Sequence, residues 1–341
     1  MAIAYINSKN LLYNFEQFKN YTKTEIIPVL KSNAYGHGIK EVFSVLKDKV
    51  KKIAVFDLDE ALTLNFENTL ILKPLYNKDE ILQAYQNNFI FNLCSHKQLE
   101  IIKKLKIKPR VEIEIDTGMN RTGIWYEEFE NFYNEAKNDV KVEGIYSHFA
   151  NADIEEDNFS SIQYERFLKV SKDISVKKHI SNTASSLRYN YYLDFIRVGI
   201  GIYGIYPAIF LKKFLNLKPV MSLKAEVIQV KFLKKGESVG YGRTFIANKD
   251  MKIAIISFGY ADGFHIECSN ITEVFAKNKY RKVLGRISMD MSVIEGDDLE
   301  EGDLVEIWGE NINILDISQR IGKIPYVLLT SLGNRVKRVL I

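Results

Sequence analysis

The sequence predicts an α/β protein: an N-terminal (β/α)8 TIM-type barrel followed by a mostly β C-terminal domain. Short β-branched runs alternate with amphipathic helical stretches before about residue 212. Beyond that point helical patterns become rare, and glycines punctuate a series of strand-like runs. The chain has 341 residues. At roughly 150 residues per domain, this length corresponds to about two domains.

The first two thirds of the chain contain eight strand-like runs. Helical patterns between them include Ile39–Lys49, Phe129–Asn138 and Gln163–Ile174. Eight parallel strands with crossover helices in roughly 200 residues favour a closed barrel. A doubly wound open sheet stays an alternative, because periodicity does not give strand order, although no GxGxxG motif follows the first run. The predicted strands are Ile26–Lys31, Lys52–Asp57, Thr69–Leu75, Asn88–Cys94, Arg110–Asp116, Val142–Phe149, Lys177–Asn182 and Phe195–Tyr203.

The second domain is predicted to be mostly β. We place the barrel at residues 7–214 and the β domain at residues 215–341. Residues 1–6 also have a strand pattern, and this strand can join either domain. The predicted strands of the β domain are Met221–Phe232, Lys252–Phe258, Tyr280–Glu295 and Asp303–Trp308.

Composition excludes several classes of protein. Hydrophobic residues make up 46% and charged residues 26%, which is typical of a globular chain and not of a disordered or fibrous one. Cys94 and Cys268 lie far apart outside any CxxC spacing, which predicts neither a disulfide framework nor a metal site and favours the cytoplasm. We see no signal peptide and no apolar run near the ~20 residues that span a bilayer. The net charge is +4, and we interpret the basic clusters Lys47–Lys52 and Lys103–Lys108 as solvated surface, with no nucleic-acid partner.

Unusual polar residues fall at the ends of the predicted barrel strands. The carboxyl ends of barrel strands converge on one face, where active sites are built. Residues far apart in sequence are therefore expected to meet around one pocket. These residues are Lys31 at the end of the first run, Arg121 after the fifth, His148 at the end of the sixth, Asn182 and Thr183 at the seventh, and Arg197 and Gly199 within the eighth.

Lys31 and Arg197 suggest a cofactor. Taken alone, Lys31 is consistent with ordinary surface and His148 with ordinary core. Lys31 follows an apolar strand, however, and desolvation there lowers an amine pKa, as Schiff-base chemistry requires. Arg197 lies in an apolar strand and cannot lose its charge, so it needs an acceptor or a ligand. The glycines of Gly199–Tyr203 and the helix start at Asn182–Ser186 suit a phosphate. A Schiff-base lysine with a phosphate site indicates pyridoxal 5′-phosphate (PLP).

Two motifs in the second domain are compatible with function. Glu237–Phe245 places Tyr241 between two glycines, which suits either a β-bulge or a tyrosine held rigidly for acid–base chemistry. Ser288–Asp290 falls within a strand-like run and can lie at a bend facing a pocket. Neither motif identifies a function alone.

The chain closely resembles the alanine racemase family, PLP enzymes with a barrel followed by a β domain. The resemblance covers essentially the whole chain, and its set of motifs is highly specific although each motif is modest. The matching segments are Leu30–Gly38, Asp116–Gly123, Ser147–Asp153, Arg197–Ile200, Val239–Gly242, Gly259–Gly263 and Ser288–Asp290.

The resemblance implies a PLP-dependent racemase that interconverts L- and D-alanine and supplies D-alanine for bacterial peptidoglycan. It implies a cytoplasmic homodimer with shared active sites, in which Tyr241, Met289 and Asp290 come from the partner subunit. Two bases act on opposite faces, Lys31 and Tyr241, and Arg197 faces the pyridine nitrogen. The residues implied to bind the cofactor are Lys31, Tyr35, His148, Asn182, Thr183, Arg197, Gly199 and Ile200. Those implied to bind the substrate are Arg121, Tyr260, Met289 and Asp290.

Two positions depart from the family pattern. Many relatives have a carbamylated lysine two residues before the aspartate of the DTG motif. Its carboxylate holds the arginine of that motif, which is Arg121 here, and this chain has Glu114 in place of the lysine. Asn334 stands where the family usually has a phosphate-binding tyrosine.

Three other classes of protein share part of this pattern. A basic amino-acid decarboxylase of the same barrel class has a glutamate at the pyridine nitrogen, where this chain has Arg197. A non-catalytic PLP carrier lacks the β domain. A barrel enzyme without PLP lacks the absorption near roughly 420 nm that the bound cofactor gives.

Overall fold

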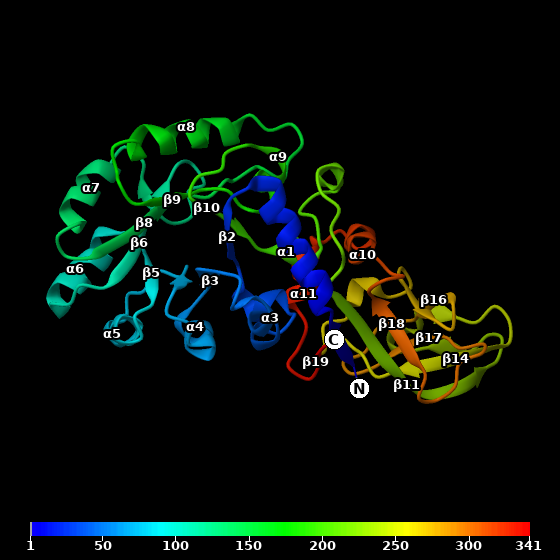
Figure 1. Cartoon of the computed structure of the whole chain (residues 1–341). Coiled ribbons are helices and arrows are strands. Elements are labelled where there is room, and N and C mark those ends of the chain that lie inside the picture. The colour runs from blue at the N-terminus through cyan, green and yellow to red at the C-terminus, as the bar shows by residue number, and fades with distance from the viewer. Residues whose placement is uncertain (1) are drawn as a thin grey trace. The chain divides into compact units, whose positions relative to one another are not determined.

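The computed structural model describes residues 2–341 and divides them into two compact units. The barrel unit comprises Leu11–Ala34 and Val42–Lys218. The β unit comprises the described residues up to Asn10, together with Tyr35–Glu41 and Pro219–Ile341. The predicted fold class is confirmed, since one unit is a nearly closed parallel barrel and the other an antiparallel β domain (Figure 1).

Eight parallel strands form the wall of the barrel unit (Figure 1). Hydrogen-bonded neighbours follow the order β2-β10-β9-β8-β6-β5-β4-β3. A bridge between Val29 and Ala54 joins the two ends of this path, so the alternative of an open sheet is wrong. A short strand, β7 (Ile124–Trp125), pairs with β6 outside the path. The wall strands are β2 (Glu25–Pro28), β3 (Ile53–Val55), β4 (Thr69–Ile71), β5 (Ile90–Leu93), β6 (Arg110–Asp116), β8 (Lys141–Tyr146), β9 (Lys177–His179) and β10 (Phe195–Val198).

Helices connect these strands. Side-chain caps help several of them to begin, because Asp57, Asn77 and Ser95 each accept a backbone N–H from the first turn. The helices from the N-terminus through the barrel are α1 (Ser8–Thr22), α2 (Lys31–Tyr35), α3 (Ile39–Leu46), α4 (Leu58–Leu64), α5 (Lys78–Gln86), α6 (His96–Leu105), α7 (Phe129–Ala136), α8 (Phe159–Ser171) and α9 (Thr183–Arg188). Two 3-10 turns, η1 (Ile200–Tyr203) and η2 (Ile209–Lys213), follow β10.

The last barrel strand is shorter than predicted. The run Phe195–Tyr203 was expected to be one strand, but β10 ends at Val198. Gly199 has φ −98° and ψ −101°, which lies outside the strand region and turns the chain into η1. The Tyr203 hydroxyl donates to the carbonyl of Val29 at 3.0 Å, which fixes this turn against the chain just after β2.

The sheet of the β unit has the order β14-β17-β16-β15-β18-β11-β1-β19, and β14 also pairs with β11. The strands nearest the two chain ends, β1 and β19, pair in parallel. Its strands are β1 (Ile3–Ile6), β11 (Met221–Leu233), β14 (Met251–Ile256), β15 (Glu273–Ala276), β16 (Lys279–Leu284), β17 (Ser292–Glu295), β18 (Leu304–Trp308) and β19 (Lys337–Leu340). The unit also contains the pair β12 (Ser238–Val239) and β13 (Phe245–Ile246), helices α10 (Ile314–Arg320) and α11 (Pro325–Thr330), and 3-10 turns η3 (Tyr241–Arg243) and η4 (Ile266–Cys268).

One predicted strand of the β unit was wrong. Tyr280–Glu295 was expected to be continuous, but it forms two antiparallel strands, β16 and β17. Gly285, at φ +71°, ends the first strand in a conformation that favours glycine. The loop that follows contains Ser288–Asp290, which therefore lies between strands and not within one.

Gly36 is expected to be essential for packing in the β unit. A Cβ at this position would lie 2.1 Å from the carbonyl oxygen of Leu329, and φ is +78°. Gly36→Ala should therefore lower the free energy of unfolding by about 2–4 kcal/mol, seen as a lower Tm. Gly302→Ala is the matched control, because Gly302 has φ +93° but, apart from Gly302 and its two chain neighbours, no described residue has an atom within 4 Å of the position that its Cβ would take. Equal Tm losses in the two variants would contradict the predicted clash.

Candidate active site

The predicted barrel residues lie at or just beyond the carboxyl ends of their strands. Lys31 begins α2, shortly after β2, and His148 lies just after β8. Arg121 lies in the segment between β6 and β7, and Arg197 lies within β10. The carboxyl ends of parallel barrel strands share one rim, so the four side chains come from the same end of the barrel.

A left-handed turn follows Lys31. Asn33 donates its backbone N–H to Glu60 at 3.1 Å, and Ala34 donates to the carbonyl of Leu30 at 2.7 Å. Left-handed backbone costs non-glycine residues roughly 1–2 kcal/mol each. Such strain is concentrated at functional sites, where the surrounding structure holds it. The residues of this turn with positive φ are Ser32 (56°), Asn33 (53°), Ala34 (53°) and Tyr35 (51°).

The amine of Lys31 lies in a strongly cationic environment. Burial lowers the pKa of Lys31, and the positive charges of Arg121 and Arg197 lower it further. Glu60 opposes these effects, although both of its carboxylate oxygens also accept backbone N–H groups. A larger fraction of this amine is therefore unprotonated near neutral pH than for an ordinary lysine, which is the state that attacks a carbonyl.

Arg197 is buried without a carboxylate in direct contact among residues 2–341. It is 4% exposed, and its guanidinium lies 5.1 Å from the centre of the Tyr146 ring. Its Nη2 donates to the carbonyl of Ser147 at 2.6 Å and to Nδ1 of His148 at 3.1 Å, while Nη1 donates to Nδ1 of His179. A permanent cation with neutral acceptors can still stabilise an electron-rich group that faces it.

His148 is held neutral by this arrangement. A guanidinium only donates hydrogen bonds, so Nδ1 of His148 carries a lone pair and the ring proton lies on Nε2. Burial lowers the pKa of His148 well below its ordinary value, and the charges of Arg197, Arg121 and Lys31 add to this effect. His148 is therefore uncharged at neutral pH.

The predicted phosphate-binding segments meet through a hydrogen bond from a backbone N–H to a side-chain hydroxyl. Gly199 donates its N–H to Oγ1 of Thr183 at 3.2 Å, which joins the start of α9 to the end of β10. Asn182 caps α9 in a reciprocal capping box with Ser185. Its Nδ2 lies 3.4 Å from Nε2 of His148. Ile200 is buried at the start of η1.

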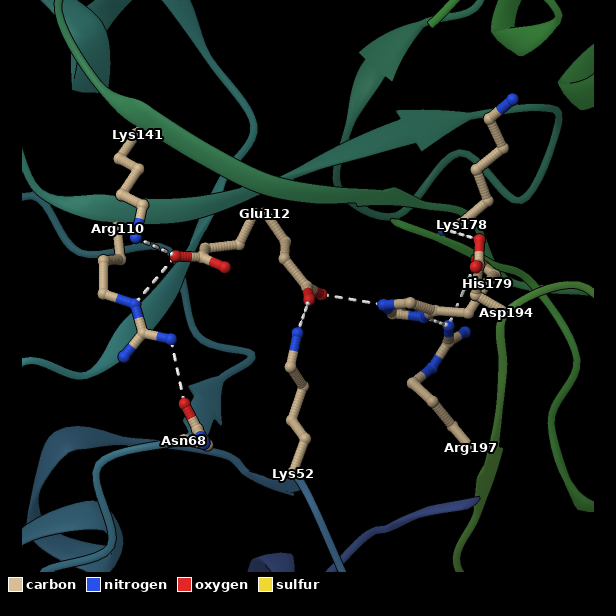
Figure 2. Close-up of polar contacts among 10 residues, drawn as sticks. Lys52, Asn68, Arg110, Glu112, Lys141, Lys178, His179, Asp194 and Arg197 are labelled. Carbon is tan, nitrogen blue, oxygen red and sulfur yellow. Dashed lines mark hydrogen bonds and ion pairs between the residues drawn. The ribbon is translucent and has the colours of Figure 1, made fainter. Parts of the chain in front are cut away.

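The sequence motifs did not single out three further polar residues of the barrel interior, which are Lys52, Glu112 and His179. Figure 2 shows Glu112 between Lys52 and His179, with Arg197 beyond the imidazole ring. Glu112 accepts from Nζ of Lys52 and from Nε2 of His179, the latter at 2.7 Å. The interpretation of Lys47–Lys52 as solvated surface was wrong for Lys52, which is only 8% exposed. The signal available in the sequence was the alternation of glutamates with apolar residues in β6. A barrel strand is buried on both faces, so Glu112 within this strand has to lie in the interior.

The carbamylated lysine of the relatives predicts that Glu114 pairs with Arg121, but Glu114 has a different partner. It is buried and accepts from Nδ2 of Asn92 at 2.8 Å. Within residues 2–341 no ion pair joins Glu114 to Arg121, and the Arg121 side chain is exposed. The negative charge of Glu114 nevertheless acts on Tyr146 and Arg197, where it favours their protonated forms.

The remaining predicted site residues belong to the β unit. Tyr241 is 72% exposed and begins η3, between Gly240 and Gly242, which both have positive φ. Tyr260 lines a surface depression with His265 and Ser331.

Backbone contacts in the β unit join the loop of Tyr260 to that of Met289. Tyr260 donates its N–H to the carbonyl of Ser288 at 3.0 Å, and Met289 is 53% exposed. Asp290 pairs with Arg335 at 2.8 Å.

Tyr35 and Asn334 also lie in the β unit. The buried Tyr35 ring packs 6.0 Å from that of Tyr326. Asn334 is exposed in a turn.

The barrel residues fit PLP. Lys31 offers an amine with a lowered pKa for the aldehyde, and the positive charges of Arg121 and Arg197 favour an anionic ligand. Arg197 has hydrogen-bond donors but, among residues 2–341, no ionised partner in contact, so it suits an electron-rich ring nitrogen.

Over the same described part of the chain, no helix is long and apolar enough to cross a bilayer, and no cluster of three or more His, Cys, Asp and Glu side chains is arranged to hold a metal.

Comparison with known proteins identifies the family. The model of the alanine racemase N-terminal domain matches residues 6–207, and that of the alanine racemase C-terminal domain matches residues 220–340. The chain is 34% identical to the alanine racemase of Haemophilus influenzae, covering 98% of this chain and 97% of that protein. It is also 34% identical to alanine racemase 2 of Caldanaerobacter subterraneus, covering 98% of this chain and 94% of the relative.

Solved structures agree over the full length of the chain. The biosynthetic alanine racemase of Pseudomonas aeruginosa superposes with a TM-score of 0.91 at 30% identity, covering 100% of this chain and 99% of that one. The alanine racemase of Bartonella henselae, solved with covalently bound pyridoxal phosphate, superposes with a TM-score of 0.90 at 30% identity and the same coverage. The chain is therefore an enzyme of the alanine racemase family.

Proposed function

We propose that this protein interconverts L- and D-alanine with PLP as its cofactor. The observation that carries the proposal is Lys31, an amine with a lowered pKa followed by a left-handed turn, near a buried cation, Arg197, that contacts neutral acceptors. The family membership of both parts of the chain supports the same activity.

The residues predicted from the sequence are assigned to PLP binding. Lys31 binds it covalently, Arg197 lies toward the ring nitrogen, and His148 supports Arg197. When bound, the cofactor withdraws electrons from the amino acid and so acidifies its α-hydrogen. The other residues proposed to hold it are Tyr35, Asn182, Thr183, Gly199 and Ile200.

Racemisation requires a proton to leave one face of the α-carbon and to return on the other. We assign these roles to Lys31 on one face and Tyr241 on the other. The neutral His148 carries its proton on Nε2, so it can donate a hydrogen bond to an ionised Tyr241 oxygen. Arg197 contributes a fixed positive charge behind His148.

The substrate is assigned to a small number of side chains. The side chains that bind alanine or shape its access to the active site are Arg121, Tyr260, Met289 and Asp290. Glu114 places a permanent carboxylate at the position where many relatives have a carbamylated lysine. The protein acts as a homodimer, with Tyr241, Met289 and Asp290 contributed by the partner subunit.

The cellular setting follows from the chemistry. D-alanine is required for bacterial peptidoglycan, and we propose that this enzyme supplies it in the cytoplasm. The two cysteines, Cys94 and Cys268, are free and buried, which suits a reducing compartment.

The activity is tested with the purified, PLP-loaded protein and a panel of single L-amino acids. We expect the D-enantiomer of alanine to accumulate until both forms are equal, with serine and larger side chains converted more slowly. Production of an amine and carbon dioxide would instead support a decarboxylase. Absence of turnover with a visible cofactor band would support a PLP carrier.

A further inference from the structure

A buried chain of contacts leads from the amino end of β3 to Arg197. Lys52 precedes β3 and pairs with one oxygen of Glu112, whose other oxygen accepts from Nε2 of His179 at 2.7 Å. Nδ1 of His179 then accepts from Nη1 of Arg197. Glu112 and His179 are 0% exposed, and the contacts connect three strands with the residue before a fourth (Figure 2).

The contact with Arg197 requires a neutral His179. A guanidinium has only donors, so Nδ1 of His179 must keep its lone pair and the single ring proton must point to Glu112. A second proton on His179 would place an N–H opposite the Arg197 N–H and break the contact. The position of Arg197 therefore depends on the protonation of His179.

Four groups on neighbouring elements surround the His179 ring and set its charge. Glu112 on β6 favours the protonated ring, whereas Arg197 on β10 and Lys52 before β3 oppose it. Tyr146 on β8 stacks on the ring, with the two ring centres 5.1 Å apart. Burial is the largest effect and, with the two cations, lowers the pKa of His179 to about 4.

Lys52 supplies the positive charge that balances the carboxylate of Glu112. Burial alone would raise the pKa of Glu112, but the positive charge of Lys52 and the hydrogen bonds from His179 and Lys52 lower it. Glu112 is therefore a full negative charge beside His179. Without Lys52, that charge would be left to attract a proton onto the imidazole.

We propose that Lys52 is a positioning residue of this enzyme: its ion pair with Glu112 balances the negative charge beside His179, so that burial keeps the imidazole uncharged and able to hold the guanidinium of Arg197 in place. Lys52 does not touch the substrate and acts only through the two residues between it and Arg197. The consequence for catalysis rests on the proposed function, whereas the protonation of His179 does not.

The test replaces Lys52 with methionine, which retains much of the side-chain volume but not the charge. The protonation of His179 is followed by NMR of the holoenzyme and the cofactor-free protein labelled at its five histidines. We expect the parent His179 to keep one proton from pH 9 to pH 6, and Lys52→Met to gain a second proton over this range. Racemase activity of Lys52→Met relative to the parent should fall about tenfold from pH 8 to pH 6, since the contact is lost as pH falls through the raised pKa.

Two further variants distinguish positioning from a structural role. Lys51→Met removes the neighbouring charge, which pairs with Glu25 at the surface, and should leave both readouts unchanged. Lys52→Met/Glu112→Gln removes both buried charges, so His179 should again keep one proton and the activity ratio should no longer depend on pH. If Lys52→Met does not fold, Lys52→Gln, which also removes the charge but keeps a polar end, replaces it in both measurements.

The outcomes of this test distinguish failure of the proposal for Lys52 from failure of the proposed function. A His179 that keeps one proton at pH 6 in Lys52→Met would overturn the proposal, as would a double variant as sensitive to acid as Lys52→Met. If no variant, parent included, racemises alanine, the proposed function fails while the NMR result still decides the role of Lys52.

Discussion

Lys31→Ala is expected to lower racemase activity by about 10⁴-fold or more, because we assign both cofactor binding and proton transfer to the same amine. The variant should also lose the absorption band near roughly 420 nm that the covalently bound cofactor gives. Lys51→Ala is the matched control, since Lys51 is exposed and pairs only with Glu25 among the described ion pairs. Its activity and absorption should equal those of the parent.

Borohydride reduction identifies the lysine directly. Reduction of the parent holoenzyme followed by peptide mapping should place the cofactor on Lys31. Burial and the charges of Arg121 and Arg197 lower the pKa of this amine, so cofactor attachment should become faster as pH rises through a range below that of an ordinary lysine. Label on another lysine, or attachment that needs the pH of an ordinary lysine, would contradict the assignment.

Mixed dimers of Lys31→Ala and Tyr241→Ala are expected to recover activity that neither parent variant has. If each site takes Lys31 from one chain and Tyr241 from the other, a hybrid dimer has one site with both defects and one intact site. Random mixing makes half of the dimers hybrid, so activity should return to about a quarter of the unmutated level under two-fold symmetry. The measurement is alanine racemisation after equal amounts of the two variants are co-refolded.

The control mixture pairs Lys31→Ala with the double variant Lys31→Ala/Tyr241→Ala. No intact site can form in that mixture, so no activity should return. If Tyr241 acts within its own chain, every hybrid site in the first mixture lacks one base. Hybrid dimers that form, as shown by differently tagged chains, but remain inactive would reject the shared site.

The periodicity of the sequence was sufficient for the architecture of the barrel unit. All eight predicted strand positions contain a strand, because parallel barrel strands are buried on both faces and appear as short apolar runs between amphipathic helices. The extent of each run was less accurate. Phe195–Tyr203 ends as a strand at Val198, because the backbone at Gly199 turns and residues distant in sequence hold the turn.

The motifs of the sequence also selected residues that the barrel brings together. Arg197 and His148 are in hydrogen-bond contact, as are Thr183 and Gly199. The left-handed turn after Lys31 could not be predicted, since its non-glycine residues favour other backbone conformations and only the surrounding structure holds them there.

The sequence by itself therefore determined the family, the strand and helix order, and the residue types at the carboxyl ends of the barrel strands. Only the tertiary structure decided that Lys52 is buried and that Glu112, His179 and Arg197 form one chain of contacts. Lys52 and its partner Glu112 are 60 residues apart, and a lysine beside other lysines has the local pattern of a surface residue. Which side chains oppose each other across a barrel depends on strand order and register, and local sequence patterns encode neither.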